Sequence, residues 1–238
     1  MENKLSIIIP FKGDPKKIDQ FSLNHQKLLE NRTNINFLII DSSNSPSIIE
    51  NNTKINYFYK PGFSLYEALN FGILKSQNLF YLAMGIDDII FENIFLAFEK
   101  IKNSEADILT FPVKNNLNTL PFSKLRINHR NFVYQHSVST IFRRDIHSKI
   151  GLYPTEFKIS ADAFIILKAY KNKLKFSKYS YPCIGEYDEN GVSSRENLMA
   201  IYELSIICLK LRFIKSSSYY FLISLLKFCL KLFKYNKY

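Results

Sequence analysis

Short, continuously apolar runs of four to six residues recur along the chain and alternate with longer segments of helical periodicity. Runs of this length, apolar throughout, are typical of strands buried on both faces of a mostly parallel sheet. We therefore predict an α/β fold, a Rossmann-like sheet flanked by helices. The predicted strands cover residues 5–9, 37–40, 55–59, 79–84, 108–113 and 139–142.

Helices are predicted between these strands, over residues 15–30, 64–76, 92–103, 143–150 and 161–172. Ser64 and Glu67 have the spacing of a capping box, in which side chain and backbone satisfy each other at a helix start. Ser160 is expected to cap the helix from 161, and Gly151 to close the one before it. Residues 114–135 are polar and give no clear assignment, and 175–195 are expected as strand and loop.

The basic charge is concentrated at the end of the chain. The 238 residues carry a formal charge of +11, and seven of the 32 basic residues lie after Glu203, where no acid follows. A basic excess favours nucleic acid, an anionic membrane or an anionic substrate as partner. Only seven glycines are present, which argues against a glycine-rich phosphate loop.

The cysteines and the lengths of the apolar segments indicate in which cellular compartment the protein is expected. The spacing of the three cysteines is neither that of metal ligands nor that of a redox pair, which is expected of a reducing cytoplasm; they are Cys183, Cys208 and Cys229. The start of the sequence lacks a signal-peptide layout, and no segment reaches the ~20 apolar residues of a membrane span. We expect a cytoplasmic protein.

Acidic residues follow two of the predicted strands. Asp41 ends the second, and Asp87 and Asp88 follow the fourth. Ligands of open parallel sheets bind beyond the carboxyl ends of the strands. Carboxylates there face a diphosphate only if a divalent cation lies between, and Mn²⁺ or Mg²⁺ with oxygen ligands suits this place. The alternative is that aspartate is simply common in turns.

Asp162 falls in the first turn of the helix predicted from residue 161. A helix N-terminus favours the ionised carboxylate, which is the state a general base needs. The same placement also stabilises helices without any chemistry, so both interpretations stay open. The four histidines show no metal-ligand spacing; they are His25, His129, His136 and His147.

A series of motifs follows in a recognisable order. They are LSIIIP at 5–10, FLIIDSSNS at 37–45, SLYEALNFGI at 64–73, YLAMGIDD at 81–88, STIFRR at 139–144 with IGLY at 150–153, KISAD at 158–162 and GVSS at 191–194. In this order they resemble the family 2 inverting glycosyltransferases over about residues 4–195.

The resemblance implies a GT-A fold, with a glycosyltransferase domain over residues 1–195. The residues after it, 196–238, are predicted from their own pattern as a helical, basic segment. It implies that Asp162 is the catalytic base, which removes the proton from the acceptor hydroxyl. It places the divalent metal on Asp87, with Asp88 in support. The nucleotide-sugar site that it implies comprises Pro10, Phe11, Asp41, Asn70, Gly85 and Asp87.

The activity implied is inverting transfer of a hexosyl or N-acetylhexosaminyl group from a nucleotide-diphosphate donor, a UDP-sugar, to a saccharide hydroxyl. The acceptor is expected to be lipid-linked, in bacterial surface polysaccharide or glycan assembly. Gly85 stands where the family carries the first acid of its Asp-x-Asp turn, and Ser42 replaces another acid. A catalytically inactive, nucleotide-sugar-binding relative is therefore an alternative.

The end of the chain predicts a helix over residues 219–234 with two unlike faces. Lys227, Lys231 and Lys234 share one stripe, and large apolar residues cover the remainder. Such a helix suits the headgroup layer of an anionic membrane, which predicts a protein peripheral to the inner face of the cytoplasmic membrane. The alternative is a helix packed on the domain. A nucleic-acid-binding module is disfavoured, because these bases lie on an apolar helix rather than on a polar patch with interleaved aromatic residues.

Overall fold

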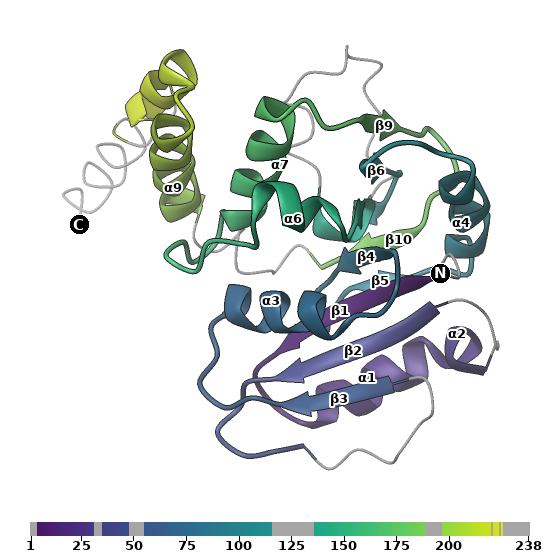
Figure 1. The fold of residues 1–238 in the computed structure, drawn as a ribbon. Coiled ribbons are helices and arrows are strands. Elements are labelled where there is room, and N and C mark those ends of the chain that lie inside the picture. The colour runs from purple at the N-terminus through teal and green to yellow at the C-terminus, as the bar shows by residue number, and fades with distance from the viewer. Residues whose placement is uncertain are drawn as a thin grey trace, which may run out of the picture.

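The computed structural model describes residues 4–30, 35–47, 55–115, 136–188, 197–219, 221–223 and 225. Its centre is a seven-stranded sheet with the strand order β3-β2-β1-β4-β8-β6-β9 (Figure 1). The strands in that order are β3 (Ile55–Tyr59), β2 (Ile35–Asp41), β1 (Leu5–Phe11), β4 (Phe80–Ala83), β8 (Thr140–Arg143), β6 (Ile108–Thr110) and β9 (Phe176–Lys178).

The sheet is mostly parallel, as the apolar runs predict. Strands β1 to β4 pair parallel to one another, β8 is antiparallel to both β4 and β6, and β9 is parallel to β6. The carboxyl ends of β1, β2, β3, β4 and β6 therefore meet at the same edge of the sheet.

Side chains of β1 alternate between two apolar cores, because successive residues of a strand point to opposite faces. Leu5, Ile7 and Ile9 belong to the core on one face, and Ile8 to the core on the other. All four are fully buried. Burial on both faces explains why the run is apolar throughout.

Helices cover both faces of the sheet (Figure 1). The core of one face includes side chains of α1 (Lys16–Asn24), α2 (Gln26–Glu30) and α4 (Ile94–Lys102). The core of the other includes side chains of α3 (Leu65–Lys75), α6 (Ile146–Ile150) and α7 (Ala161–Lys171). The last long helix of the described chain, α9 (Asn197–Lys210), packs against α7 on this second face.

Gly72 lets α3 approach the sheet. A Cβ atom added at this position would lie 2.4 Å from Ile8 Cγ2, which is closer than real Cβ contacts come. The glycine of the SLYEALNFGI motif at 64–73 is thus required by packing.

A second, three-stranded sheet was not predicted from the sequence. It consists of β5 (Ile89–Ile90), β10 (Gly185–Tyr187) and β7 (Lys114–Asn115) in that order. A short 3-10 turn, η1 (Ser137–Ser139), precedes β8. These elements of two or three residues are too short to show a periodicity.

Two local predictions were wrong. The helix predicted over residues 15–30 is interrupted at His25, which separates α1 from α2. His25 is buried there, and its Nε2 accepts a hydrogen bond from Ile90 N at 3.0 Å. Ser160 does stand at the start of α7, but its side chain makes no capping bond; its hydroxyl donates to Ala200 O in α9 at 3.2 Å.

The capping box of α3 is confirmed. Ser64 Oγ accepts from Glu67 N at 3.4 Å, and Glu67 Oε2 accepts from Ser64 N at 2.8 Å. Gly151 closes α6 with a positive φ of 75°, as expected of a glycine after a helix.

The basic tail is described only in part. Lys227, Lys231 and Lys234, as well as Cys229 and the motif at 191–194, lie outside the described residues. Among the helices that the structure describes, none combines the length and the apolar character that crossing a membrane requires.

Candidate functional site

Three adjacent strands bring the predicted nucleotide-sugar residues other than Asn70 to one edge of the sheet. Phe11 at the end of β1 is in register with Asp41 at the end of β2. The turn from Gly85 to Asp88 follows β4, which pairs with the other side of β1. Pro10 lies one residue before Phe11. The topology thus gathers these residues where parallel sheets bind ligands.

Asp41 is completely buried, and its carboxylate accepts four hydrogen bonds. Oδ1 accepts from Ser43 N at 2.9 Å, and Oδ2 accepts from Ser47 N, Ser47 Oγ and Tyr57 Oη at 3.2, 2.9 and 2.6 Å. Burial raises the pKa of Asp41, but these bonds outweigh it and hold the pKa below its usual value. The carboxylate therefore shapes the loop 42–47, and its place near the nucleotide base stays a prediction.

Asp88 turns inward beneath the turn after β4. Its Oδ2 accepts from Gly85 N at 2.7 Å, and its Oδ1 from Asp188 N at 3.1 Å. Burial is the main cause that raises the pKa of Asp88 to about 6. A Cβ atom at Gly85 would lie 3.2 Å from Asp88 Oδ2. Gly85 stands where the family carries its first acid, and its small size leaves room for the Asp88 carboxylate, which binds the backbone of its own turn.

Asp87 points outward, to the N-terminal turn of α1. Lys17 Nζ donates to its Oδ1 at 2.9 Å and to its Oδ2 at 2.7 Å, and both side chains are about half exposed. Lys17 was not singled out from the sequence, because a lysine early in a helix carries no signal of its own.

Asn70 is engaged with the chain beyond α6. Its Nδ2 donates to Tyr153 O at 2.8 Å, and its Oδ1 accepts from Tyr153 N at 2.9 Å. This two-way bond joins α3 to the segment that leads to α7. A direct contact of Asn70 with a nucleotide sugar stays a prediction.

Asp162 lies in the first turn of α7, with aromatic and acidic neighbours from three other parts of the chain. Its Oδ1 accepts from Ala163 N at 2.8 Å. Burial is the main cause that raises the pKa of Asp162 to about 6; the negative charge of Glu203 adds to this rise, and the bond from Ala163 N opposes it. The same carboxylate contributes, after burial, to the raised pKa of Tyr66 and Tyr153.

The N-terminus of α7 is fastened to α3, which begins beyond the carboxyl end of β3. Tyr66, in the first turn of α3, accepts from Ala161 N at 3.0 Å through its hydroxyl oxygen and donates to Ile159 O. The start of α7 with Asp162 therefore lies on the side of the sheet where β3 ends. Tyr66 was not singled out from the sequence, where it is one residue of the SLYEALNFGI motif at 64–73.

The arrangement limits how a divalent metal could be held. Asp87 is accessible at the strand edge, while the oxygens of Asp88 accept backbone N–H groups. Among the residues that the structure describes, no group of three or more His, Cys, Asp or Glu side chains is placed to hold a metal. Mg²⁺ and Mn²⁺ commonly use one or two carboxylates together with substrate phosphates and water. Asp87 fits that mode of binding if the Lys17 ammonium moves away from its two oxygens.

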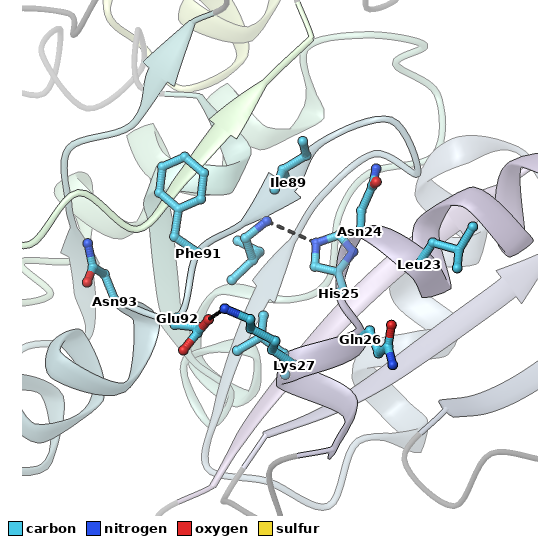
Figure 2. A pocket seen from close by; sticks show the side chains of 11 residues that line it. Leu23, Asn24, His25, Gln26, Lys27, Ile89, Phe91, Glu92 and Asn93 are labelled. Atoms are coloured by element: carbon cyan, nitrogen blue, oxygen red, sulfur yellow. Dashed lines mark hydrogen bonds and ion pairs between the residues drawn. The ribbon is translucent and has the colours of Figure 1, made fainter.

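A hollow of about 540 Å³ lies away from these residues, between the α1–α2 junction and the segment from β5 to α4 (Figure 2). Its lining includes Leu23, Phe91 and the ion pair of Lys27 with Glu92, whose Nζ and Oε1 are 3.3 Å apart. None of the predicted site residues lines it. His25 in its wall uses both ring nitrogens within the fold, so this hollow does not belong to the candidate site.

Comparison with solved structures shows the GT-A fold of glycosyltransferases, as predicted. S. aureus TarS 1-349 in complex with UDP-GlcNAc matches with a TM-score of 0.69 at 18% identity, over 87% of this chain and 66% of that chain. The mannosyltransferase PcManGT from Pyrobaculum calidifontis, in complex with GDP-Man and Mn²⁺, matches with a TM-score of 0.62 at 11% identity, over 87% of this chain and 63% of that chain.

This chain is shorter than the proteins it matches. It covers 65% of TarS 1-349 and 40% of a longer TarS structure, with TM-scores of 0.67 in both cases and 18% and 19% identity. No protein-family model matches the sequence, and no curated protein does so either.

Proposed function

We propose that the chain is a glycosyltransferase that moves a sugar from a nucleotide-diphosphate donor, a UDP-sugar, to a hydroxyl of a saccharide acceptor. The observation that carries the proposal is the set of aspartates at the carboxyl edge of a GT-A sheet, together with Asp162 at the start of α7. The fold is shared with TarS, whose complex with UDP-GlcNAc supports a nucleotide sugar as donor.

Asp162 is the proposed catalytic base. A sugar hydroxyl is a weak nucleophile, and a positioned base must take its proton as it attacks the anomeric carbon. With its pKa raised to about 6, Asp162 is ionised at neutral pH and still more basic than an ordinary aspartate. Attack from the side opposite the leaving nucleotide inverts the anomeric configuration, which is the outcome proposed here.

Asp87 is the proposed metal ligand, and the Mn²⁺ of the PcManGT complex supports this choice. When bound, the metal offsets the charge that gathers on the leaving diphosphate. Lys17 holds Asp87 in place and is itself a cation at this edge. Asp88 keeps the turn in shape through Gly85 and Asp188.

The donor is identified by incubating the full chain with UDP-GlcNAc, UDP-Glc, UDP-Gal and GDP-Man, with a bacterial lipid extract as acceptor, with and without Mn²⁺. Release of UDP that needs the extract and Mn²⁺ supports the proposal. UDP binding without release from any donor would favour the inactive, nucleotide-sugar-binding relative. If no nucleotide binds at all, the proposed activity is wrong.

The metal ligand is tested with Asp87→Ala, with Asp145→Ala as a matched control because Asp145 is exposed at the start of α6. Mn²⁺ should tighten UDP binding to the wild type and to the control, but not to Asp87→Ala. Equal tightening in all three proteins would remove Asp87 from this role.

An anionic membrane is the proposed partner of the C-terminal segment, where it would give access to a lipid-linked acceptor. Large apolar side chains are exposed at the described part of this segment: Leu209, Ile214, Phe221, Leu222 and Leu225. All seven charged residues after Glu203 are basic. An anionic bilayer satisfies both features, because it buries apolar side chains and attracts lysines by about 1 kcal/mol each.

Vesicle sedimentation tests the membrane partner. The full chain should bind vesicles that contain phosphatidylglycerol and leave them as salt rises. Binding should be lost in a chain truncated after residue 215 and when Lys227, Lys231 and Lys234 are changed to Glu. If the full chain stays in the supernatant at low salt, the helix is packed on the protein instead.

A further inference from the structure

We propose that Glu203 of α9 is a positioning residue for Asp162, acting through the backbone that enters α7. This inference rests on the proposed role of Asp162 in turnover. It concerns a carboxylate that the sequence motifs do not include and that lies about forty residues further along the chain.

Glu203 is buried, with 5% of its surface exposed, and its carboxylate collects three consecutive backbone N–H groups. Oε1 accepts from Lys158 N at 2.7 Å, and Oε2 accepts from Ile159 N at 3.0 Å and from Ser160 N at 2.8 Å. Successive N–H groups aimed at one point form an anion-binding concavity. Here the anion is a side chain of the protein itself.

The backbone N–H groups of residues 158–161 all donate to side chains from other parts of the chain. Glu203 takes the N–H groups of residues 158, 159 and 160, and the Tyr66 hydroxyl takes that of Ala161. Asp162 is the next residue. Two side chains from distant helices, α9 and α3, therefore fix where the first turn of α7 begins and where its aspartate lies.

Charge provides a second link between the two carboxylates. Among the described residues, Glu203 of α9 is the ionisable group whose charge raises the pKa of Asp162, whereas Asp162 itself raises the pKa of Tyr66 of α3 and of Tyr153 after α6. Both tyrosines are neutral at physiological pH because burial raises their pKa. The positive charge of Lys158 belongs to an exposed side chain. Glu203 is thus the charged group that acts on Asp162 at neutral pH, and it favours retention of the proton.

Two substitutions change the charge and the hydrogen bonds to different extents. An amide at 203 keeps one accepting oxygen and so cannot serve all three N–H groups, which use both oxygens of Glu203. Glu203→Gln keeps the size of the side chain and removes the charge, so the pKa of Asp162 should fall and the acid limb of kcat should move to lower pH. Glu203→Asp keeps the charge but is one methylene too short to serve all three N–H groups. It should leave the acid limb near its wild-type pH and lower kcat about tenfold through misplacement of Asp162.

Ser217→Ala is the matched control. Ser217 Oγ donates to Ser205 O at 2.9 Å, so the change loosens the α9 region without touching residues 158–160. It should lower the melting temperature at most, and leave the pH profile and the KM for the donor unchanged. A merely structural role of Glu203 predicts that both Glu203 variants behave like this control.

The readouts are the pKa of Asp162, followed through its carboxyl ¹³C resonance and identified with Asp162→Asn, and the pH profile of kcat with UDP-GlcNAc. A lower pKa of Asp162 in Glu203→Gln than in the wild type and Ser217→Ala supports the inference, whatever the donor proves to be. An unchanged pKa in folded Glu203→Gln overturns it. If that variant does not fold, wild-type kcat in Glu203→Asp overturns it instead. Full turnover in Asp162→Asn would contradict the proposed base, independently of the NMR result.

Discussion

Asp41 is a buried aspartate and Asp162 a partly buried one, both close to the proposed site, yet the fold shifts their pKa values in opposite directions. Asp41 accepts four hydrogen bonds from the loop after β2 and from β3, and its pKa is lowered. Asp162 accepts a bond from Ala163 N and has Glu203 as an acidic neighbour, and its pKa is raised to about 6.

The difference shows how burial is used in the two regions. Burial raises the pKa of both carboxyls, so hydrogen-bond donors and neighbouring charge decide the outcome. At Asp41 the donors hold the anion firmly, which suits a structural anchor. At Asp162 the anion is less satisfied and therefore keeps its affinity for a proton, which suits a base.

The largest expected effect is on turnover. Asp162→Asn should lower kcat by about 10² to 10⁴-fold, because it removes the group that accepts the hydroxyl proton. UDP binding should stay unchanged, since the substitution lies outside the nucleotide edge. The wild-type kcat should fall as pH decreases through about 6, where Asp162 takes up its proton.

The measurement is UDP release at saturating donor over pH 5 to 9, with Asp145→Asn as control. Asp145 also stands at a helix start, but it is exposed and makes no capping bond. Near-wild-type turnover in Asp162→Asn would mean that Asp162, like Asp41, has a structural role only, and the proposed functional difference between these two aspartates would be wrong.

The next effect is on stability. Asp41→Asn should lower the free energy of unfolding by about 3 kcal/mol, because an amide NH₂ would face donors that now serve a charged acceptor. The pKa of Asp41 is lowered in the folded state, so its contribution is fully present above the unfolded pKa. It is lost as pH falls through the lower, folded pKa.

Urea unfolding at pH 7 measures this effect, and two tyrosines of β3 sharpen it. Tyr57→Phe removes the 2.6 Å bond to Asp41 Oδ2 and the 2.8 Å bond that Tyr57 Oη accepts from Ser47 N, whereas Tyr59→Phe removes a bond to Asn44 O in the same loop. The first should cost about 1 to 2 kcal/mol and the second less than half of that. Equal losses of unfolding free energy in the two variants would mean that a bond to the Asp41 carboxylate stabilises the fold no more than a bond to the backbone carbonyl of Asn44.

The two regions also differ in how far the sequence predicts them. The strands, the capping box of Ser64 and the edge with Asp41 and Asp87 follow from local patterns, because each depends on residues within one turn or one strand. The motif order then indicated the GT-A fold that the structural comparison shows. Periodicity and turn chemistry are sufficient where the partners are neighbours in sequence.

Contacts between distant segments were not predictable in this way. Glu203 meets residues 158–160 across more than forty positions, Tyr66 meets Ala161 across 95, and Lys17 meets Asp87 across 70. A buried acid in a helix looks in sequence like a solvated one. The expected cap by Ser160 was wrong because the Ser160 hydroxyl donates to Ala200 O in α9, while Ala163 N, which such a cap could have served, donates to Asp162 Oδ1.

The smallest expected effect concerns the stability cost of keeping Asp162 basic. Its pKa is raised in the folded state, so below the unfolded pKa, near 4, both states are protonated and the carboxyl contributes nothing. As pH rises from about 4 to about 6, the unfolded chain ionises this carboxyl while the folded state retains the proton, so the folded state loses stability over this range and the loss is complete above about 6. Asp162→Asn should therefore be more stable than the wild type at pH 8, by about 1 to 2 kcal/mol after solvent screening, and equal to it near pH 4.

Urea unfolding at pH 4.5, 6 and 8 measures this difference in stability, and Asp145→Asn should show no such trend. If Asp162→Asn were less stable than the wild type at pH 8, the Asp162 carboxylate would stabilise the fold as that of Asp41 does. Removing the charge raises the free energy of unfolding only where the fold leaves the carboxylate short of hydrogen-bond donors.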